Sequence, residues 1–423
     1  MKIVYFNYVD NAIGPLIRTL ELAKACADNG IEVALYCMSR GFKPPAFVFE
    51  RIRAYQSDKL RIHYSTRFES AVMQAQAKPA APKQAPGEPR ARTLGLLKQT
   101  AASLRHVRAE VEIIRREKPD AVMARPDLAF SFCLSTRWTG VPLVLDTDGP
   151  VEELALYWGV PSKLFPVFDT WRARAADSIL VISRVCQELL RAKLPADTRF
   201  FVVPNGTHAQ EFAPQPAARR QALQQTLGLT EGRVVGYSGN QRVWHGLPHL
   251  LRSCRPLLQA DPALKVLVIG CGFNPGLQQQ CAIPEEVFRK QIVFTGPLSY
   301  WDMAAHIDLA DLMVMPYAQL PLFYFSPMRM FEAMSLGKSL ITSRQGQMQD
   351  LLDGRSAVRF FDTDREEGLH EVLAASIYDE AFIAEGRRNR DYLVSEHTWH
   401  ARGATIRQAL AQAIAGRAKV AAP

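Results

Sequence analysis

Cysteine is scarce in this sequence: seven cysteines occur among 423 residues, and none forms a CxxC pair. This excludes a small secreted domain held together by disulfides. Long hydrophobic runs are also missing, because the long uncharged stretch at residues 312–328 is interrupted by Pro316, Pro321 and Pro327. The first residues lack a charged segment followed by an apolar one. We therefore expect no transmembrane helix, no signal peptide and a cytoplasmic location.

Several motifs for cofactors and reactive groups are absent as well. The sequence has no Walker loop, and its glycine-rich segment 270–276 misses the GxGxxG pattern, so nothing indicates NAD. His245 and His249 are four residues apart, but Pro248 lies between them and disfavours a metal site. No serine or cysteine stands in a nucleophile elbow. We predict no metal site.

The composition is that of a globular protein, with 48% hydrophobic and 22% charged residues, and the length suggests two or three domains. Part of the net charge of +9 is concentrated in residues 78–118, which contain ten Lys or Arg and four Glu. This segment is either a solvated helix face with a loop or a patch that binds an anionic membrane surface. We expect no nucleic acid, because no zinc spacing, RNP sequence or basic zipper accompanies the charge.

The first half of the chain alternates between short apolar strands and helical segments. Residues 16–27 predict a helix, with Pro15 in its first turn and Gly30 just past its end. Such alternation favours parallel strands joined by crossover helices. The predicted strands are 2–6, 31–36, 121–123, 143–145 and 179–182. Residues 74–92 are rich in Ala, Pro, Lys and Gln and predict a flexible insertion.

A second alternating block begins near residue 232, after a linker and helix at 207–230. Its apolar stripe at 247–258 predicts a helix. The predicted strands of this block are 233–237, 265–269, 292–294, 312–315 and 339–341. The fold class we predict is α/β, with two doubly wound blocks facing a cleft in which ligands bind at the carboxyl ends of strands.

The clearest local signal is a predicted helix at 327–336. Ser326 is suited to the N-cap, and Gly337 to the position after the helix. Arg329 falls in the first turn, where a cation is unfavourable unless an anion shares the site. That anion is either a bound phosphate or a nearby carboxylate. Glu332 lies among apolar residues and needs a hydrogen-bond partner, which ligand hydroxyls or a protein group could supply.

A second glycine-rich turn, residues 236–246, joins a strand to an amphipathic helix. Gly239 and Gly246 allow a ligand to approach the backbone, and Arg242 and His245 supply donors there. Two such helix beginnings in one block, with the carboxylate of Glu332 nearby, are suited to a diphosphate and a ribose.

The sequence resembles a known family, the retaining GT-B glycosyltransferases of family 4, also called group 1. Single matches are short, but they occur in the family's order along most of the chain. The matching segments are residues 118–125, 176–183, 203–212, 239–246, 294–296, 310–316, 326–338 and 398–399. The resemblance implies two Rossmann-like domains: 1–200 on the acceptor side, 201–390 for the nucleotide sugar, and a helix at 391–423 crossing back to the first domain.

The resemblance implies that the second domain binds a nucleoside diphosphate sugar without a resident cofactor. Glu332 corresponds to the second Glu of the family's E-x7-E motif, which binds the ribose, and Tyr324 replaces the first Glu. Arg242 and Arg329 would stabilise the diphosphate, and with Glu332 they are the predicted catalytic residues. The further predicted donor-binding residues are Gly239, Asn240, His245, Gly296, Tyr324, Ser326 and Met328. A protonated His245 beside the diphosphate is one hypothesis.

On the acceptor side, the predicted residues are Gly14, Arg125, Asp148 and Glu152. Acids at 146–153 could contact acceptor hydroxyls or simply be solvated. The predicted activity is transfer of a hexosyl-type residue to a glycan or lipid-linked acceptor in cell-surface polysaccharide or glycolipid synthesis, with peripheral binding to the inner membrane face. The alternatives are a GT-B nucleotide-sugar epimerase and a non-catalytic binding or scaffold protein.

Overall fold

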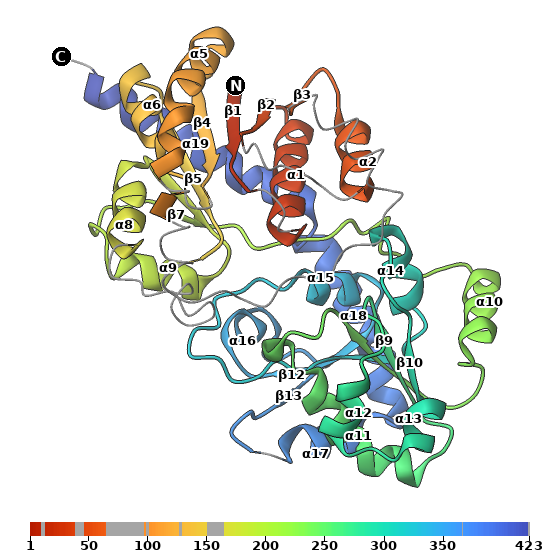
Figure 1. The fold of residues 1–423 in the computed structure, drawn as a ribbon. Helices are drawn as coiled ribbons and strands as arrows, with labels where there is room; N and C mark the ends of the chain where they lie inside the picture. Colours follow the sequence, from red (N-terminus) through yellow and green to blue (C-terminus); the bar gives the residue numbers. More distant parts are fainter. Residues whose placement is uncertain are drawn as a thin grey trace. The chain divides into compact units, whose positions relative to one another are not determined.

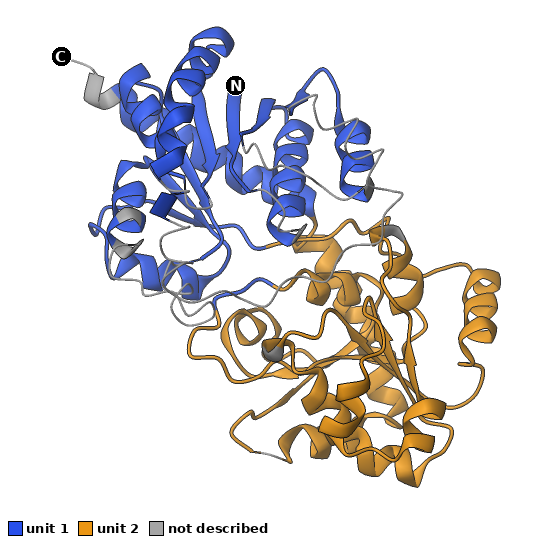
Figure 2. Ribbon diagram, viewed as in Figure 1, with its two compact units in different colours: residues 1–204, 324–326, 399–423 blue, residues 205–323, 327–398 orange. Residues whose placement is uncertain are grey.

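The computed structural model describes residues 1–9, 13–38, 46–64, 97–98, 101–126, 129–149, 165–365 and 367–421. The chain divides into two compact units, coloured separately in Figure 2. Unit 1 comprises Met1–Pro204, Tyr324–Ser326 and Trp399–Pro423, and unit 2 comprises Asn205–Phe323 and Pro327–Thr398. The sequence placed these boundaries at 200/201 and 390/391. The predicted flexible insertion at 74–92 lies outside the described residues.

Unit 1 contains a fully parallel sheet in the order β3-β2-β1-β4-β5-β6-β7 (Figure 1). Strand order reverses between β1 and β4, so ligand-binding side chains are expected at their carboxyl ends. The strands are β1 (Lys2–Asn7), β2 (Glu32–Cys37), β3 (Leu60–His63), β4 (Ala121–Arg125), β5 (Leu143–Thr147), β6 (Ser178–Val181) and β7 (Phe200–Val202).

Helices alternate with these strands, as the apolar spacing predicted. The long helix α19 packs on α1 and β6, and the Ser178 hydroxyl donates to the Ala409 carbonyl at 3.3 Å. The last segment of the chain thereby completes unit 1. The helices are α1 (Ile13–Asp28), α2 (Ala46–Tyr55), η1 (Ser103–His106), α5 (Val107–Glu117), α6 (Ser131–Thr139), α8 (Phe165–Ala175), α9 (Arg184–Arg191) and α19 (Trp399–Ala421).

Unit 2 contains a second fully parallel sheet, in the order β10-β9-β8-β11-β12-β13. Its order reverses between β8 and β11. The strands are β8 (Val234–Ser238), β9 (Lys265–Ile269), β10 (Ile292–Phe294), β11 (Leu312–Met315), β12 (Ser339–Ser343) and β13 (Val358–Phe361). Together the two sheets confirm the predicted α/β class with two doubly wound domains.

The helices of unit 2 surround this sheet. The stripe of α11 predicted from the sequence is buried at Leu247, Leu250, Leu251, Cys254 and Leu258. The helices are α10 (Ala217–Leu227), η2 (Val243–His245), α11 (Leu247–Ala260), α12 (Pro275–Cys281), α13 (Glu285–Gln291), α14 (Tyr300–Ile307), α15 (Met328–Ser335), α16 (Gly346–Leu352), α17 (Gly368–Ser376) and α18 (Glu380–Glu396). None of the helices that the structure describes is both long and apolar enough to cross a membrane.

Candidate functional site

The candidate site of unit 2 lies where β8 and β11 end, on the two sides of the strand-order reversal. The turn after β8 carries Gly239 and leads through η2 into α11, and the segment after β11 begins at Pro316 and leads to α15. Because the strands are parallel, these turns belong to the same edge of the sheet. The two glycine-rich and helix-start signals recognised in the sequence therefore meet in the fold.

Gly239 and Arg329 are in direct contact at this edge. A Cβ atom added to Gly239 would lie 2.0 Å from Nη1 of Arg329, so the guanidinium group rests against the bare backbone. The φ angle of Gly239 is +142°, a value that side chains of L-residues rarely allow. Only glycine at this position permits both the turn and the approach of the guanidinium group.

The guanidinium of Arg329 is surrounded by polar groups but has no carboxylate within ion-pairing distance among the described residues. Burial lowers the pKa of Arg329, but Tyr317, Tyr237 and Glu332 around it raise the pKa above its ordinary value. Arg329 is therefore a permanent, half-buried cation. A cation without a paired carboxylate in a partly desolvated position favours the binding of an anion.

His245 lies beside Arg329, with its Nε2 3.5 Å from Nη2 of the guanidinium. Its other ring nitrogen, Nδ1, is 3.3 Å from the carbonyl oxygen of Asn240, which can only accept a hydrogen bond. Burial and the positive charge of Arg329 lower the pKa of His245 to about 3. In the ligand-free protein the imidazole is therefore expected to be neutral at physiological pH. The hypothesis of a protonated His245 concerns the complex with a diphosphate and stays a prediction.

We expect His245 to show no protonation between pH 8 and pH 5 in the free protein, measured by NMR titration of its ring protons and assigned with His245→Gln. Its folded-state pKa of about 3 lies below the ordinary value of 6.5, so the unfolded chain binds this proton more strongly. The contribution of His245 to the free energy of unfolding therefore falls as the pH drops below 6.5 towards 3. A measured pKa near 6.5 would contradict this environment.

The other predicted donor-binding residues of unit 2 differ in their burial and in their position. Glu332 is 7% exposed on α15, one turn beyond Arg329, and acts on the pKa of Tyr317 as well as that of Arg329. Met328 is the first residue of α15, whose start is not capped by any described side chain. Arg242 is exposed, and its guanidinium lies 5.1 Å from the centre of the Trp244 ring.

Gly296 lies at the end of β10, with a φ angle of +73°. Its carbonyl accepts a hydrogen bond of 2.9 Å from the Thr295 hydroxyl, and that hydroxyl also accepts one of 3.0 Å from the N–H of Gly270. Gly296 therefore shapes the β9–β10 part of the same sheet edge. No contact between Gly296 and Arg329 is found in the described structure.

The structure corrects the predicted environment of Ser326 and Tyr324. Pro327, not Ser326, is the N-cap of α15, so the helix begins one residue later than predicted. Both Tyr324 and Ser326 group with unit 1. The Tyr324 carbonyl accepts a hydrogen bond of 2.7 Å from Ser183, and its ring packs so closely on Gly149 that a Cβ there would lie 2.1 Å from it. Donor binding by Tyr324 and Ser326 stays a prediction.

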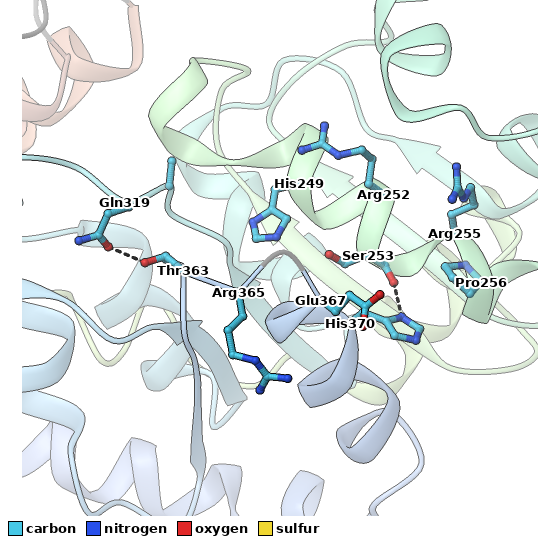
Figure 3. A pocket seen from close by; sticks show the side chains of 11 residues that line it. His249, Arg252, Ser253, Arg255, Pro256, Gln319, Thr363, Arg365, Glu367 and His370 are labelled. Carbon is cyan, nitrogen blue, oxygen red and sulfur yellow. Dashed lines mark hydrogen bonds between the residues drawn. The ribbon is translucent and has the colours of Figure 1, made fainter.

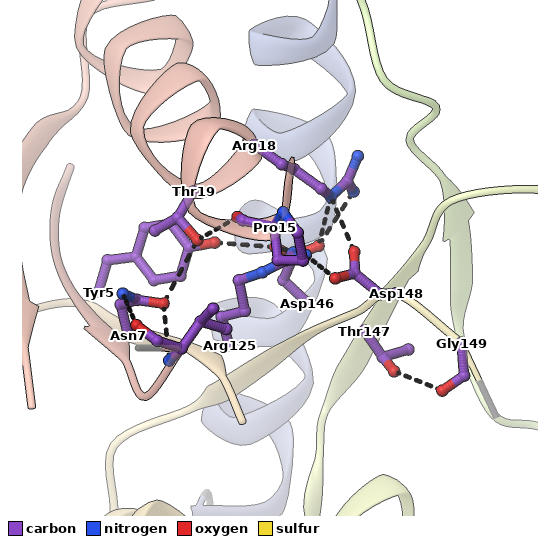
Figure 4. A network of polar contacts seen from close by, with 11 residues as sticks. Tyr5, Asn7, Pro15, Arg18, Thr19, Arg125, Asp146, Thr147, Asp148 and Gly149 are labelled. Atoms are coloured by element: carbon purple, nitrogen blue, oxygen red, sulfur yellow. Dashed lines mark hydrogen bonds and ion pairs between the residues drawn. The ribbon is translucent and has the colours of Figure 1, made fainter. Parts of the chain in front are cut away.

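Unit 1 carries its own polar network where β1, β4 and β5 end (Figure 4). Asp146 is fully buried and accepts hydrogen bonds from Arg18 (3.0 Å), Arg125 (2.6 Å) and the Tyr5 hydroxyl (2.8 Å). Burial raises the pKa of Asp146, but Arg18 and Arg125 more than compensate, so its pKa lies below the ordinary value. The Asp146 carboxylate is buried and already accepts hydrogen bonds from three protein side chains, so it is not available to bind a ligand.

Asp148 is the member of this network that reaches the surface, with 38% of its side chain exposed. It forms ion pairs with Arg125 and, at 3.8 Å, with Arg18. The guanidinium of Arg125 is itself 2% exposed, so Arg125 can position Asp148 but does not face solvent. Gly14 lies in the first turn of α1, one turn before Arg18, and Glu152 lies outside the described residues.

Sequence reasoning missed Tyr237, Tyr317 and Arg18. The two tyrosines belong to apolar runs and look like core residues, and no motif singles them out. Arg18 interrupts the apolar face of α1, and that interruption is the one signal from which a buried ion pair could have been inferred. No group of three or more His, Cys, Asp or Glu that could hold a metal occurs within the described ranges.

Comparisons with known families match both halves of the chain. The family model described as "Glycosyl transferases group 1" matches residues 232–377, which contain the Arg329 cluster. The model described as "Glycosyl transferase 4-like domain" matches residues 14–206, which contain Arg18, Arg125 and Asp146 of the unit 1 network. A comparison with curated proteins finds no match.

Solved structures share the fold along almost the whole chain. A glycosyltransferase from Rickettsia africae is 13% identical, with a TM-score of 0.69 over 98% of this chain and 99% of the other. HepE from Anabaena, in complex with UDP and glucose, is 15% identical, with a TM-score of 0.69 over 97% and 99%. A UDP-GlcNAc 2-epimerase from Neisseria meningitidis, bound to UDP-GlcNAc, is 12% identical, with a TM-score of 0.58 over 97% and 100%. At such identities the likeness establishes the fold alone.

Proposed function

The chain belongs to the group 1 (family 4) glycosyltransferases of GT-B fold, and from this premise we propose that it transfers a sugar from a nucleoside diphosphate sugar to a glycan or lipid-linked acceptor, with retention of configuration. A hexosyl residue and a role in cell-surface polysaccharide or glycolipid synthesis are part of the proposal. It uses no resident cofactor. UDP in the HepE complex supports a nucleoside diphosphate donor.

The observation that carries this proposal is the cation of Arg329 at the start of α15, which has no carboxylate partner among the described residues. The N–H groups of the first helical turn and the guanidinium are both donors, and the helix adds a partial positive charge. A diphosphate accepts hydrogen bonds and carries negative charge, so it complements both. The neutral His245 next to Arg329 adds a hydrogen-bonding group without further charge.

Glu332 supplies the second half of the donor site in this proposal. Its carboxylate is on the same helix, one turn beyond Arg329. In this proposal it binds the ribose that follows the diphosphate. During transfer, negative charge develops on the leaving diphosphate while the sugar becomes oxocarbenium-like. Arg329 and the start of α15 would stabilise that charge, which makes the catalysis mainly electrostatic.

Asp148 is the acceptor-side residue that we propose to contact hydroxyl groups, with Arg125 and Arg18 as positioning residues. We expect Asp148→Asn to lower kcat/KM for the acceptor roughly 10- to 100-fold, the usual loss for one hydrogen bond to a charged group. Donor affinity should stay unchanged because Asp148 belongs to unit 1. The control is Asp197→Asn, which neutralises another exposed carboxylate of unit 1. Equal effects of the two variants would contradict the assignment.

The function is tested by a thermal-shift screen of UDP, GDP and ADP sugars, followed by transfer assays with acceptor extracts. We expect one nucleotide class to raise the unfolding temperature and to release its diphosphate only when acceptor is present.

Glu332→Ala should reduce turnover several-fold or more while the fold survives. NMR of the product reports the anomeric configuration, and an inverted product would contradict retention.

The second candidate function is that of a nucleotide-sugar epimerase, because the Neisseria meningitidis epimerase shares the fold. Its lower TM-score of 0.58, against 0.69 for the Rickettsia africae glycosyltransferase, and the group 1 match favour the transferase. The protein is incubated with the donor sugar alone, and NMR monitors the sugar. Appearance of an epimer without acceptor would support the epimerase instead.

We also propose that one face of unit 1 binds an anionic membrane. Six of the ten basic residues at 78–118 belong to the described part of the chain, and all six are exposed. They lie in or near η1 and α5: Lys98, Arg105, Arg108, Arg115, Arg116 and Lys118. Lys78, Lys83, Arg90 and Arg92 lie outside the described residues. Leu104 is 46% exposed on η1, and Trp138 is 71% exposed on the adjoining α6. Bases next to exposed apolar side chains are suited to a membrane interface.

Vesicle sedimentation tests the membrane proposal. Binding to vesicles with anionic lipid should weaken as salt increases, and also in Trp138→Ala and in Arg105→Gln/Arg108→Gln. Phe273→Ala, which removes an exposed aromatic ring of unit 2, is the control and should bind as the wild type does. Binding that is independent of salt and equal in all variants would refute the proposal.

A further inference from the structure

Unit 2 contains a pocket outside the candidate donor site. It is a cavity of about 800 Å³ between α11, the residues after β11, and the start of α17 (Figure 3). This volume lies within the range of small-molecule sites. None of the residues around Arg329 that form the candidate donor site lines it.

Positive charge dominates the lining. Three arginines line the cavity, Arg252, Arg255 and Arg365, against a single lining acid, Glu367, in the described structure. Arg365 is paired at 2.6 Å with Glu371, whereas Arg252 and Arg255 form no ion pair with any residue that the structure describes. Two cations on successive positions of one helical face, without counter-charges, repel each other unless an anion lies between them.

Neutral hydrogen-bonding groups complete the lining. The Nδ1 atom of His370 lies 2.8 Å from the Ser253 carbonyl oxygen, so Nδ1 carries the proton and the ring is held between α17 and α11. The Thr363 hydroxyl donates to the side-chain carbonyl of Gln319 across the cavity mouth. His249, from the first turn of α11, adds a second imidazole.

We propose that this pocket binds a small molecule carrying at least two anionic groups, either phosphoryl or carboxylate. Arg252 and Arg255 would each meet one anionic group, and their planar guanidinium groups fit both chemistries through paired N–H donors. The histidines and Thr363 would contact neutral hydroxyls of the same molecule. Ala318 of the lining directly follows Tyr317, whose ring lies 6.0 Å from that of His245, so the pocket adjoins the donor cluster without sharing its residues.

Calorimetry with inorganic tripolyphosphate and with citrate tests the proposal and distinguishes phosphoryl from carboxylate ligands. All titrations use the full chain carrying Arg329→Gln, so that anions binding at the candidate donor site do not contribute. We expect at least one probe to bind, with an affinity that falls as salt increases. In this background, Arg252→Gln/Arg255→Gln should weaken binding about tenfold or more.

The matched control is Arg289→Gln/Arg387→Gln, which removes two exposed charges elsewhere in unit 2 and should leave the affinity unchanged. Arg365→Gln is a second variant, expected to weaken binding less because Arg365 is already paired. The proposal is overturned if neither probe binds the Arg329→Gln protein, or if the control pair weakens binding as much as the pocket pair. Failure of the proposed transferase function would instead show as unchanged donor binding in Arg329→Gln.

Discussion

Arg329→Gln is expected to weaken binding of the nucleoside diphosphate by about 100-fold while the protein remains folded. The guanidinium lies against Gly239, beside His245 and Tyr237, without a carboxylate partner in the described structure, so its charge is not neutralised before the ligand binds. Loss of one charged donor to a phosphate group costs about 2–4 kcal/mol. Isothermal titration of the wild type and the variant with the diphosphate found in the donor screen measures the change.

Two controls separate this loss from a general defect. Arg387→Gln removes an exposed charge of unit 2 and should bind as the wild type does. Gly239→Ala keeps Arg329 but places a Cβ 2.0 Å from its guanidinium, so it should also weaken binding. Gly228→Ala imposes backbone strain at φ +65° with open space around it, and should not affect binding. If Gly239→Ala behaves like Gly228→Ala, the position of Arg329 is not what governs affinity.

Asp146→Asn is expected to destabilise unit 1 by about 3–5 kcal/mol, the usual cost of removing one partner from a buried ion pair. The variant removes the fully buried carboxylate and leaves Arg18 and Arg125 paired, among the described contacts, with the partly exposed Asp148. In a unit of this size, such a loss lowers the unfolding temperature by roughly 10 °C. Because the folded-state pKa of Asp146 is depressed below 3.8, its stabilisation is present at neutral pH and is lost as the pH falls through that depressed value.

Asp148→Asn is the matched control for stability, since it removes a carboxylate that pairs with the same two arginines. With 38% of its side chain exposed, Asp148 is solvated in part, and its removal should cost about 1 kcal/mol or less. Thermal unfolding of the two variants is compared with that of the wild type. Equal destabilisation by Asp146→Asn and Asp148→Asn would show that burial does not determine the strength of this network.

The central strands could be predicted from the sequence, and the missed strands lie at or next to sheet edges. The predicted strands 233–237, 265–269 and 312–315 are uncharged after Arg233 and Lys265 at the starts of the first two, because helices cover both faces of a central parallel strand. The strands β3, β7 and β13 are partly exposed, and their short sequences include Arg61, His63 and Arg359. Charged or polar residues interrupt the apolar pattern of β3 and β13, and β7 has only three residues, so none of the three strands gives a clear signal.

The candidate donor site was predictable where local rules apply and unpredictable where distant segments meet. Gly239, Arg329 and Glu332 follow from turn chemistry, helix-end electrostatics and an acid among apolar residues. The contact of Gly239 with Arg329 joins residues 90 positions apart, which no local pattern encodes. The low pKa of His245 has the same origin, because part of its cause is Arg329.

Tyr324 shows a different limit of sequence reasoning. The family's motif spacing placed it with Glu332, eight residues later, in a single donor site. In the structure its ring packs on Gly149, and Ser183 binds its carbonyl, so its described contacts are with residues of unit 1. A buried tyrosine at this position contributes packing where the family carries a charge, and the donor proposal therefore depends on Arg329 and Glu332 instead.

The most direct measurement is a crystal structure of the protein soaked with the sugar nucleotide identified by the thermal-shift screen. The account predicts diphosphate density at the Arg329 guanidinium and the start of α15, with the ribose hydroxyls at the Glu332 carboxylate. Nucleotide density that leaves Arg329 and Glu332 without contact to the ligand would contradict it.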